Sequence, residues 1–324
     1  MGKKKIKHLG RKKSKSIHKF IKKIITILGV LVTLLAFINL NNHTKELYEE
    51  VNIEDSEIEF YINMADEIGD KSVQLSWKEL MAIDMVKYEK KLTNIKKKDV
   101  IDIGKKFIKN EVDDKGNKIK KVKSFNTVIN EIGFNKEEKK LAKEYLEELK
   151  GISLSGATLK NQNEKIDFLK QISKLSYDNF EKYNILPSIT VGQAILESNW
   201  GQSKLTKDSN NVFGIKADSK WNGKTIKVKT SENYNYKVIA TFRKYKSIND
   251  SVDDYGKFLN ENKRYKESGL FEATHYTTQA QALEDAGYAT KKNEKGELIY
   301  ADILIDLIKK YNLQLLDKNV QEIK

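Results

Sequence analysis

Apolar residues recur at helical spacing along residues 44–150, with polar residues between them. Ser76 and Glu79 have the spacing of a capping box, and they predict that a helix begins at Trp77. Three more helices are indicated by apolar residues at helical spacing. The first set is Val100, Ile103 and Phe107, and the second is Phe125, Val128, Ile129 and Ile132. The third set is Leu141, Tyr145 and Leu149, and its helix is predicted to start at the cap residues Asn135 and Glu138. The polar run 113–118 predicts a turn. We therefore predict a small helical accessory domain over residues 44–150.

A second pattern follows the polar segment 151–164, which is poor in large apolar residues and is typical of a linker. "LPSITVGQAILESNWG" predicts an apolar helix that Ser188 caps and that ends near Gly201 in the left-handed conformation. Residues 225–242 then alternate between apolar and polar on either side of a short turn, which predicts a β-hairpin. The predicted fold is mostly α, with an α+β second domain over residues 165–318.

One apolar run is of a different kind. Residues 24–40 contain no charged side chain. The length of this run is close to the shortest that spans a bilayer. No small-x-small cleavage site follows the run, so an uncleaved transmembrane anchor is favoured over a signal peptide. Lysine and arginine crowd its N-terminal side, which predicts that residues 1–23 are cytoplasmic and that the remainder lies on the wall side of the cell membrane.

The positive net charge of the chain is concentrated in its N-terminal tail. The formal net charge is +14, but residues 1–23 contain eleven lysines and arginines and no acid. This leaves +3 for the other 301 residues, so the basicity belongs to the tail. A basic face for nucleic acid is therefore not predicted in the main body of the protein.

Two residue types restrict the chemistry. The chain has no cysteine, which excludes a thiol nucleophile and a disulfide framework. Its four histidines form no metal-ligand spacing, and two of them lie in the basic tail. We predict neither a metal site nor a cofactor.

Carboxylates at unusual places are the candidate catalytic groups. Glu197 falls in the last turn of the apolar helix, where the helix dipole and apolar neighbours both raise the pKa of a carboxyl. A carboxyl that keeps its proton can protonate a glycosidic oxygen. Glu232 ends the less charged face of the hairpin. By spacing alone, an exposed structural glutamate remains an equal alternative at both positions.

The order of several motifs adds to this pattern. They are "QAILESNWGQS" (193–203), "NNVFGIK" (210–216), "TSENYNYKVIATFRKYKSINDSVDDY" (230–255), "RY" (264–265), "ALEDAGYAT" (282–290) and "YADILIDLI" (300–308). Together they resemble the wall N-acetylglucosaminidases of glycoside hydrolase family 73, the flagellar and autolysin type. The resemblance covers residues 165 to about 315.

This resemblance implies a lysozyme-like domain with a β-hairpin lobe, and hydrolysis of the β-1,4 bond after N-acetylglucosamine in peptidoglycan. It implies that Glu197 is the general acid, Glu232 the hairpin carboxylate and Tyr288 a catalytic tyrosine of the groove. The residues that it places at the substrate are Trp200, Asn211, Phe213 and Gly214. Arg243 and Tyr245 are predicted to tie the hairpin to the helical body.

Other functions remain open at this stage. The same fold serves muramidases and lytic transglycosylases, and an inactive module would bind wall glycan as a scaffold of an envelope complex. The presence of Glu197, Glu232 and Tyr288 together favours an enzyme. A tethered hydrolase suits local wall opening for a secretion, conjugation or division complex, among which the sequence does not choose. It does not choose between inversion and retention either.

Overall fold

The computed structural model describes residues 53–113, 116–152, 159, 162–232 and 236–322. Within these ranges the chain is mostly helical with two small antiparallel hairpins, which confirms the predicted fold class at this level. The basic tail 1–23 and the predicted anchor 24–40 lie outside the described residues. No helix in the part of the chain that the structure describes is both long and apolar enough to cross a bilayer.

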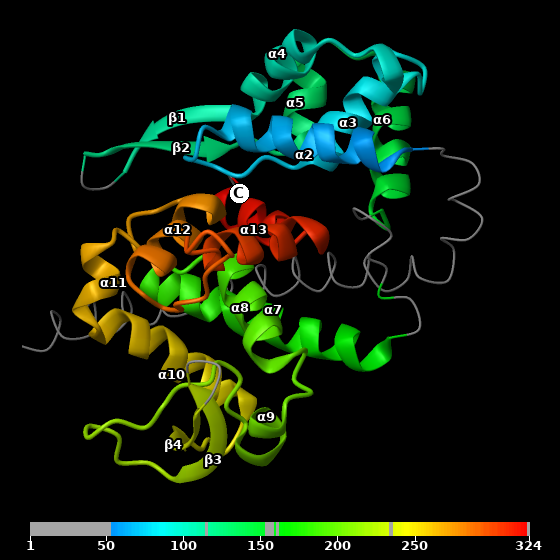
Figure 1. The fold of residues 1–324 in the computed structure, drawn as a ribbon. Coiled ribbons are helices and arrows are strands. Elements are labelled where there is room, and N and C mark those ends of the chain that lie inside the picture. Colours follow the sequence, from blue (N-terminus) through cyan, green and yellow to red (C-terminus); the bar gives the residue numbers. More distant parts are fainter. Residues whose placement is uncertain (1–52, 114–115, 153–158, 160–161, 233–235, 323–324) are drawn as a thin grey trace, which may run out of the picture.

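The first half of the described chain packs helices and one hairpin around its own core (Figure 1). Its elements are α2 (Asp55–Gly69), α3 (Trp77–Lys87), the 3₁₀ turn η1 (Leu92–Asn94), α4 (Lys97–Phe107), β1 (Ile108–Val112), β2 (Lys118–Val122), α5 (Phe125–Glu131) and α6 (Lys136–Leu149). Trp77 is fully buried there, as the helical pattern predicts for the first residue of α3. The apolar sets predicted for α4, α5 and α6 contain most of the buried residues of those helices. Gly104 and Ala142 are buried as well, whereas the predicted Ile132 and Leu141 are only partly buried.

The β1–β2 hairpin corrects the prediction that residues 44–150 are helical throughout. Its strands read "IKNEV" and "KIKKV", so charged residues stand where a clear alternation would have revealed a strand. The sequence indicates only the turn between them, where Gly116 has a φ of 84° and its N–H donates to the carbonyl of Asp113. Cross-strand pairing from Ile108–Val122 to Val112–Lys118 then forms the hairpin.

The two predicted capping boxes have different outcomes. At α6, Asn135 accepts from the N–H of Glu138 and Glu138 accepts from the N–H of Asn135, so this box is confirmed. At α3, Ser76 accepts from the N–H of Glu79 at 3.3 Å, as predicted. The carboxylate of Glu79 instead accepts from Lys318 at 2.7 Å, so the second half of this box is wrong.

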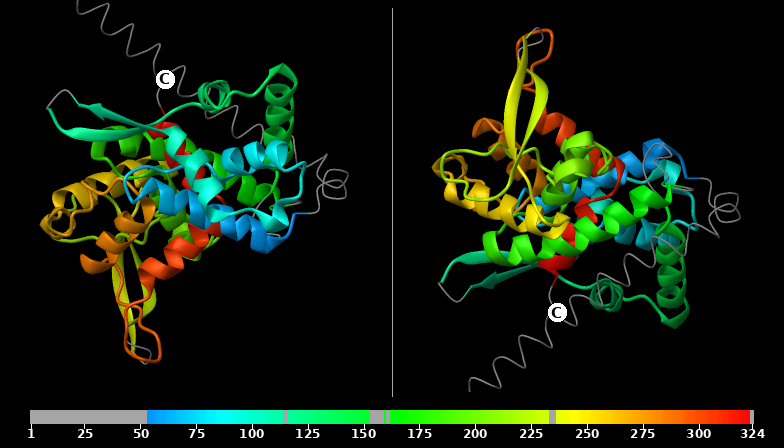
Figure 2. Two further views of the ribbon diagram at one scale, coloured as in Figure 1. Left: turned by 90° about the horizontal axis from the view of Figure 1, so that it is seen from above. Right: turned by 90° about the horizontal axis from the view of Figure 1, so that it is seen from below.

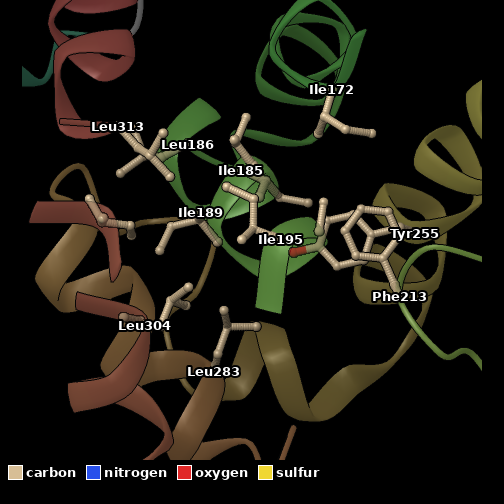
Figure 3. Close-up of a cluster of buried hydrophobic side chains, with 14 of the residues drawn as sticks. Ile172, Ile185, Leu186, Ile189, Ile195, Phe213, Tyr255, Leu283, Leu304 and Leu313 are labelled. Atoms are coloured by element: carbon tan, nitrogen blue, oxygen red, sulfur yellow. The ribbon is translucent and has the colours of Figure 1, made fainter. Parts of the chain in front are cut away.

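The second half of the chain surrounds a central apolar helix, α8 (Pro187–Ser198). Its other elements are α7 (Asn163–Tyr183), α9 (Lys204–Ser209), β3 (Thr225–Glu232), β4 (Tyr236–Arg243), α10 (Ile248–Glu261), α11 (Lys263–Glu267), α12 (Tyr276–Asp285), α13 (Tyr300–Lys310) and α14 (Gln314–Gln321). Figure 3 shows side chains of α7, α8, α12 and α13 meeting in one cluster. Gly192 permits a close approach of α8 and α13, because a Cβ there would lie 2.8 Å from Leu304 of α13.

The N-terminus of α8 is capped from a distance. Pro187 is the first helical residue, and Ser188 lies inside the helix, so the prediction that Ser188 is the cap is wrong. Its N–H donates to Oδ1 of Asp317 at 2.8 Å, and its hydroxyl donates to Oδ2 of Asp317 at 2.5 Å. Asp317 belongs to α14, so the last described helix satisfies the first turn of the helix that carries Glu197.

Asp317→Asn is expected to weaken the pH dependence of stability. Burial raises the pKa of Asp317 from its ordinary 3.8 to about 7. The native state therefore holds this proton more tightly than the unfolded chain, and the free energy of unfolding falls as pH rises between these values. Asparagine still accepts from the N–H of Ser188 but does not titrate. Denaturant unfolding at several pH values measures this, and equal pH dependence in both proteins would refute it.

In the ribbon, the C-terminal helices lie against the first half of the chain (Figures 1 and 2), and polar side chains of α14 and of the residues before it join the two halves. Nε1 of Trp77 donates to Oδ1 of Asn312 at 3.1 Å, and the N–H of Gln74 donates to Oε1 of Gln321 at 2.6 Å. The predicted domain end at residue 318 falls inside α14, so a protein cut there loses part of this helix and the contact of Gln321.

Candidate active site

Glu197 lies in the last turn of α8, where the chain turns sharply. Asn199, Trp200 and Gly201 all have positive φ values, of 49°, 59° and 76°. The left-handed Gly201 is confirmed, whereas the left-handed conformation of Asn199 and Trp200 was not predicted. The hydroxyl of Ser198 stabilises the turn by accepting from the N–H of Gly201 at 2.7 Å. This conformation is costly for a residue as large as tryptophan, and such strain is typical of functional sites.

Glu197 is exposed as a residue, although buried neighbours such as Tyr300 lie against its carboxyl. Burial by these neighbours raises the pKa of Glu197, and the hydrogen bond from Tyr300 offsets part of the rise. The direction is the predicted one, and the largest cause is burial. Because Glu197 also reaches solvent, it can present its proton to a bound substrate.

Three buried side chains stand behind this carboxyl. The hydroxyl of Tyr300, the first residue of α13, donates to Oε1 of Glu197 at 3.0 Å. Nε2 of Gln193 donates to the hydroxyl of Tyr300 at 2.8 Å, and Tyr255 of α10 donates to Oε1 of Gln193. None of these three residues was a predicted site residue, although Gln193, Tyr255 and Tyr300 each lie in one of the motifs that carry the resemblance.

Tyr288 lies beside the same carboxyl. The turn before it is made possible by Gly287, with a φ of 70°, and the N–H of Tyr288 donates to the carbonyl of Leu283. Its ring lies 5.4 Å from the ring of Tyr300, centroid to centroid. Burial, with the nearby Glu197 as a further cause, raises the pKa of Tyr288 well above its ordinary value. Tyr288 is therefore a neutral phenol near the predicted acid.

Glu232 is placed only by its backbone. It is the last residue of β3 and pairs with Tyr236 across the hairpin, while the turn 233–235 and the Glu232 side chain are outside the described residues. The base of the hairpin is held firmly: Arg243 Nη1 and the hydroxyl of Tyr245 both donate to Oδ2 of Asp254, at 2.8 and 2.6 Å. The predicted tie between hairpin and body is confirmed, and the catalytic role of Glu232 stays a prediction.

Comparison with known proteins finds a family that matches the part of the chain that contains this site. Residues 173–313 match the family described as glucosaminidase, mannosyl-glycoprotein endo-beta-N-acetylglucosaminidase. These residues form a glucosaminidase-family domain. It is a glycoside hydrolase domain, and its matched range includes Glu197, Glu232 and Tyr288.

Two curated relatives resemble the same part of the chain. The exo-glucosaminidase LytG of Bacillus subtilis is 36% identical over 170 residues, which cover 49% of this chain and 57% of LytG. The peptidoglycan hydrolase FlgJ of Escherichia coli K12 is 36% identical over 130 residues, which cover 38% of this chain and 41% of FlgJ. The chain thus spans less than two thirds of either relative. The catalytic domain of the autolysin Auto of Listeria monocytogenes is 34% identical, with 47% of this chain and 87% of that chain covered and a TM-score of 0.41.

The residues predicted to contact substrate in the glucosaminidase domain differ in their surroundings. Trp200 is 8% exposed and packs edge-on against Tyr311, and Phe213 stacks on Tyr255 with ring centroids 3.9 Å apart. Gly214 has a φ of 63°, and a Cβ added there would meet open space. Of these residues, Gly214 therefore has the clearest room for a ligand to approach the backbone.

Asn211 holds the loop of the glucosaminidase domain that contains Phe213. Its Nδ2 donates to the carbonyls of Ile215 and Arg243, both at 2.9 Å, and its Oδ1 accepts from the N–H of Ile215. The side chain is 1% exposed. The structure therefore gives Asn211 a positioning role, and its predicted substrate contact stays a prediction.

Among the described residues, no group of three or more histidines, aspartates and glutamates has the arrangement of a metal site. A cavity of about 190 Å³ lies between the two halves, lined by Lys78, Leu146, Leu169 and Leu316 among others, and it does not include Glu197.

Proposed function

We propose that this protein is a membrane-anchored peptidoglycan hydrolase that cleaves the β-1,4 bond after N-acetylglucosamine by general acid catalysis. The carrying observation is the Glu197 carboxyl, whose pKa is raised by burial while the residue stays exposed to solvent. Such a carboxyl donates a proton to a leaving glycosidic oxygen near neutral pH. The name of FlgJ, peptidoglycan hydrolase, supports peptidoglycan as the substrate, and the family match and the name of LytG support a glucosaminidase.

The proposed mechanism needs a second group at the sugar. We assign this role to Glu232, on a lysozyme-like domain with a β-hairpin lobe. Its carboxylate would orient water or stabilise the positive charge that develops at the anomeric carbon. The substrate's own N-acetyl group is the alternative nucleophile. Tyr288, a neutral phenol beside Glu197, supplies a hydrogen-bond donor to the same region.

Mass analysis of reducing ends after digestion of purified peptidoglycan tests the bond that is cleaved. We expect products that end in reducing N-acetylglucosamine. Reducing N-acetylmuramic acid would assign the protein to the muramidases, and 1,6-anhydro ends would assign it to the lytic transglycosylases. Absence of products from folded protein would favour an inactive wall-binding module. The length distribution of the released chains separates endo from exo attack, and we propose endo attack.

The proposed location rests on the sequence of residues 1–40. A basic tail before an uncharged run favours a single span with a cytoplasmic N-terminus and the enzyme on the wall side. Protease added to intact protoplasts is then expected to remove the chain beyond Leu40. A membrane-extracted protein that begins near residue 40 would contradict the anchor. A tethered hydrolase would open the wall locally, as a secretion, conjugation or division complex requires.

A further inference from the structure

We propose that Tyr300 is the positioning residue of this site: it fixes the Glu197 carboxyl so that the acidic proton stays on Oε2 and faces the substrate. The role of Glu197 as the acid rests on the proposed function. The hydrogen-bond geometry around Tyr300 does not depend on that function.

The hydrogen bond between Tyr300 and Glu197 is the last of a series of hydrogen bonds that starts in the core. Tyr255 and Gln193 are fully buried, and Tyr300 is 4% exposed. The chain runs from the hydroxyl of Tyr255 to Oε1 of Gln193, then from Nε2 of Gln193 to the hydroxyl of Tyr300 (2.8 Å), and then to Oε1 of Glu197 (3.0 Å). Each member therefore holds the next one in orientation.

The direction of this chain decides which oxygen of Glu197 carries the proton. A phenol has one hydrogen, and because the Gln193 amide donates to Tyr300, the hydrogen of Tyr300 points to Glu197. Oε1 is then occupied as an acceptor. Oε2 accepts no hydrogen bond from the residues that the structure describes, so the proton of the acid form sits there. If the Gln193 amide had the opposite orientation, the hydroxyl of Tyr300 would donate to Gln193 and accept from Glu197. The acidic proton would then sit on Oε1, which faces away from the substrate.

The backbone holds Tyr300 rigidly in this place. Tyr300 begins α13, and Oε2 of the buried Glu284 accepts from the N–H of Ala301 at 3.0 Å, which satisfies the start of that helix. The close packing of Leu304 on Gly192 then sets α13 against α8. Since Gln193 and Glu197 are one turn apart on α8, Tyr300 meets both from one position.

Among the side chains that the structure describes, few titratable groups face Glu197 from the packed elements. They are Tyr300 of α13, Tyr288 of the loop before it and Tyr255 of α10, each raised in pKa mainly by burial and further by Glu197 itself. All three are neutral phenols near neutral pH. A change in the titration of Glu197 after removal of one hydroxyl therefore reports on that hydrogen bond.

Tyr300→Phe keeps the ring and removes the hydroxyl. A donor that favours the carboxylate is lost, so the pKa of Glu197 is expected to rise. In kinetics on peptidoglycan, the alkaline limb should move to higher pH, and kcat should fall about 10-fold with little change in KM. Carbon-13 titration of the glutamate carboxyls, assigned with Glu197→Gln, measures the pKa without any substrate. Tyr255→Phe should move it in the same direction by a smaller amount.

Tyr177→Phe is the matched control. Tyr177 is a buried tyrosine of α7 whose hydroxyl accepts from Asn319 at 3.4 Å, and it is not a member of the chain. It should leave both the titration and the pH limb unchanged. Melting curves show which variants are folded, and Tyr255→Phe provides the test if Tyr300→Phe is not.

The outcomes separate the two proposals. If the protein cleaves peptidoglycan but the Glu197 titration in folded Tyr300→Phe is unchanged or moves to lower pH, the positioning role is wrong and the proposed function stands. If the wild-type protein is inert while the titration moves upward as expected, the positioning role stands and the proposed function is wrong.

Discussion

Replacing Glu197 by glutamine is expected to reduce the rate of peptidoglycan hydrolysis at or above the upper end of the range of about 10²–10⁴-fold that general acid catalysis contributes. Glutamine preserves the shape of the side chain and can still accept from Tyr300, so the loss reports the missing proton. The alkaline limb of the pH–rate profile should also disappear, because that limb records the deprotonation of the acid. Both measurements need purified protein with an unchanged melting curve.

Glu232→Gln is the matched comparison on the other predicted carboxyl. We expect a smaller loss, about 10–10²-fold, since water or the N-acetyl group of the substrate can take over part of its role. Near wild-type activity of Glu197→Gln would overturn the whole catalytic assignment. A defect in Glu232→Gln as deep as that in Glu197→Gln would instead establish an obligatory pair of carboxylates.

Lys318→Met is expected to destabilise the protein by about 3–5 kcal/mol, the usual loss when one partner of a buried ion pair is removed. The Lys318 ammonium donates to Oε1 of Glu79 at 2.7 Å, and the two side chains are 8% and 9% exposed. Without Lys318, Glu79 remains buried with no counter-charge from the residues that the structure describes. Its pKa, already raised by burial, should rise further, so the destabilisation should grow between pH 5 and pH 8.

Calorimetry of Lys318→Met tests this, because the pair joins α3 to α14 and its loss should separate one unfolding transition into two. Lys263→Met is the control: its partner Glu267 is 3.8 Å away and both side chains are exposed, so no measurable change is expected. The double variant Glu79→Leu with Lys318→Met should recover most of the stability. A loss in Lys318→Met no larger than in Lys263→Met would show that the buried pair does not hold the two halves together.

The sequence by itself determined the local elements that have strong patterns. The helix from Trp77, the capping box of Asn135 and Glu138, and the hairpin over residues 225–243 follow from hydrophobic spacing and cap residues that act within a few positions. The sequence also located Glu197 at the end of an apolar helix and gave the direction of its pKa. Where the pattern was weak, as in the lysine-rich strands β1 and β2, a hairpin was read as a turn within a helical region.

Only the tertiary structure decided which distant groups satisfy one another. Asp317 caps α8 from 129 residues away, and Tyr300 reaches Glu197 across 103 residues. The carboxylate of Glu79 accepts from Lys318, whereas the local sequence predicts that it closes a capping box with Ser76. The physical reason is the same in each case: a buried polar group needs a partner, and any element that packing brings near can provide it. Local spacing indicates that such a group exists, and the fold selects its partner.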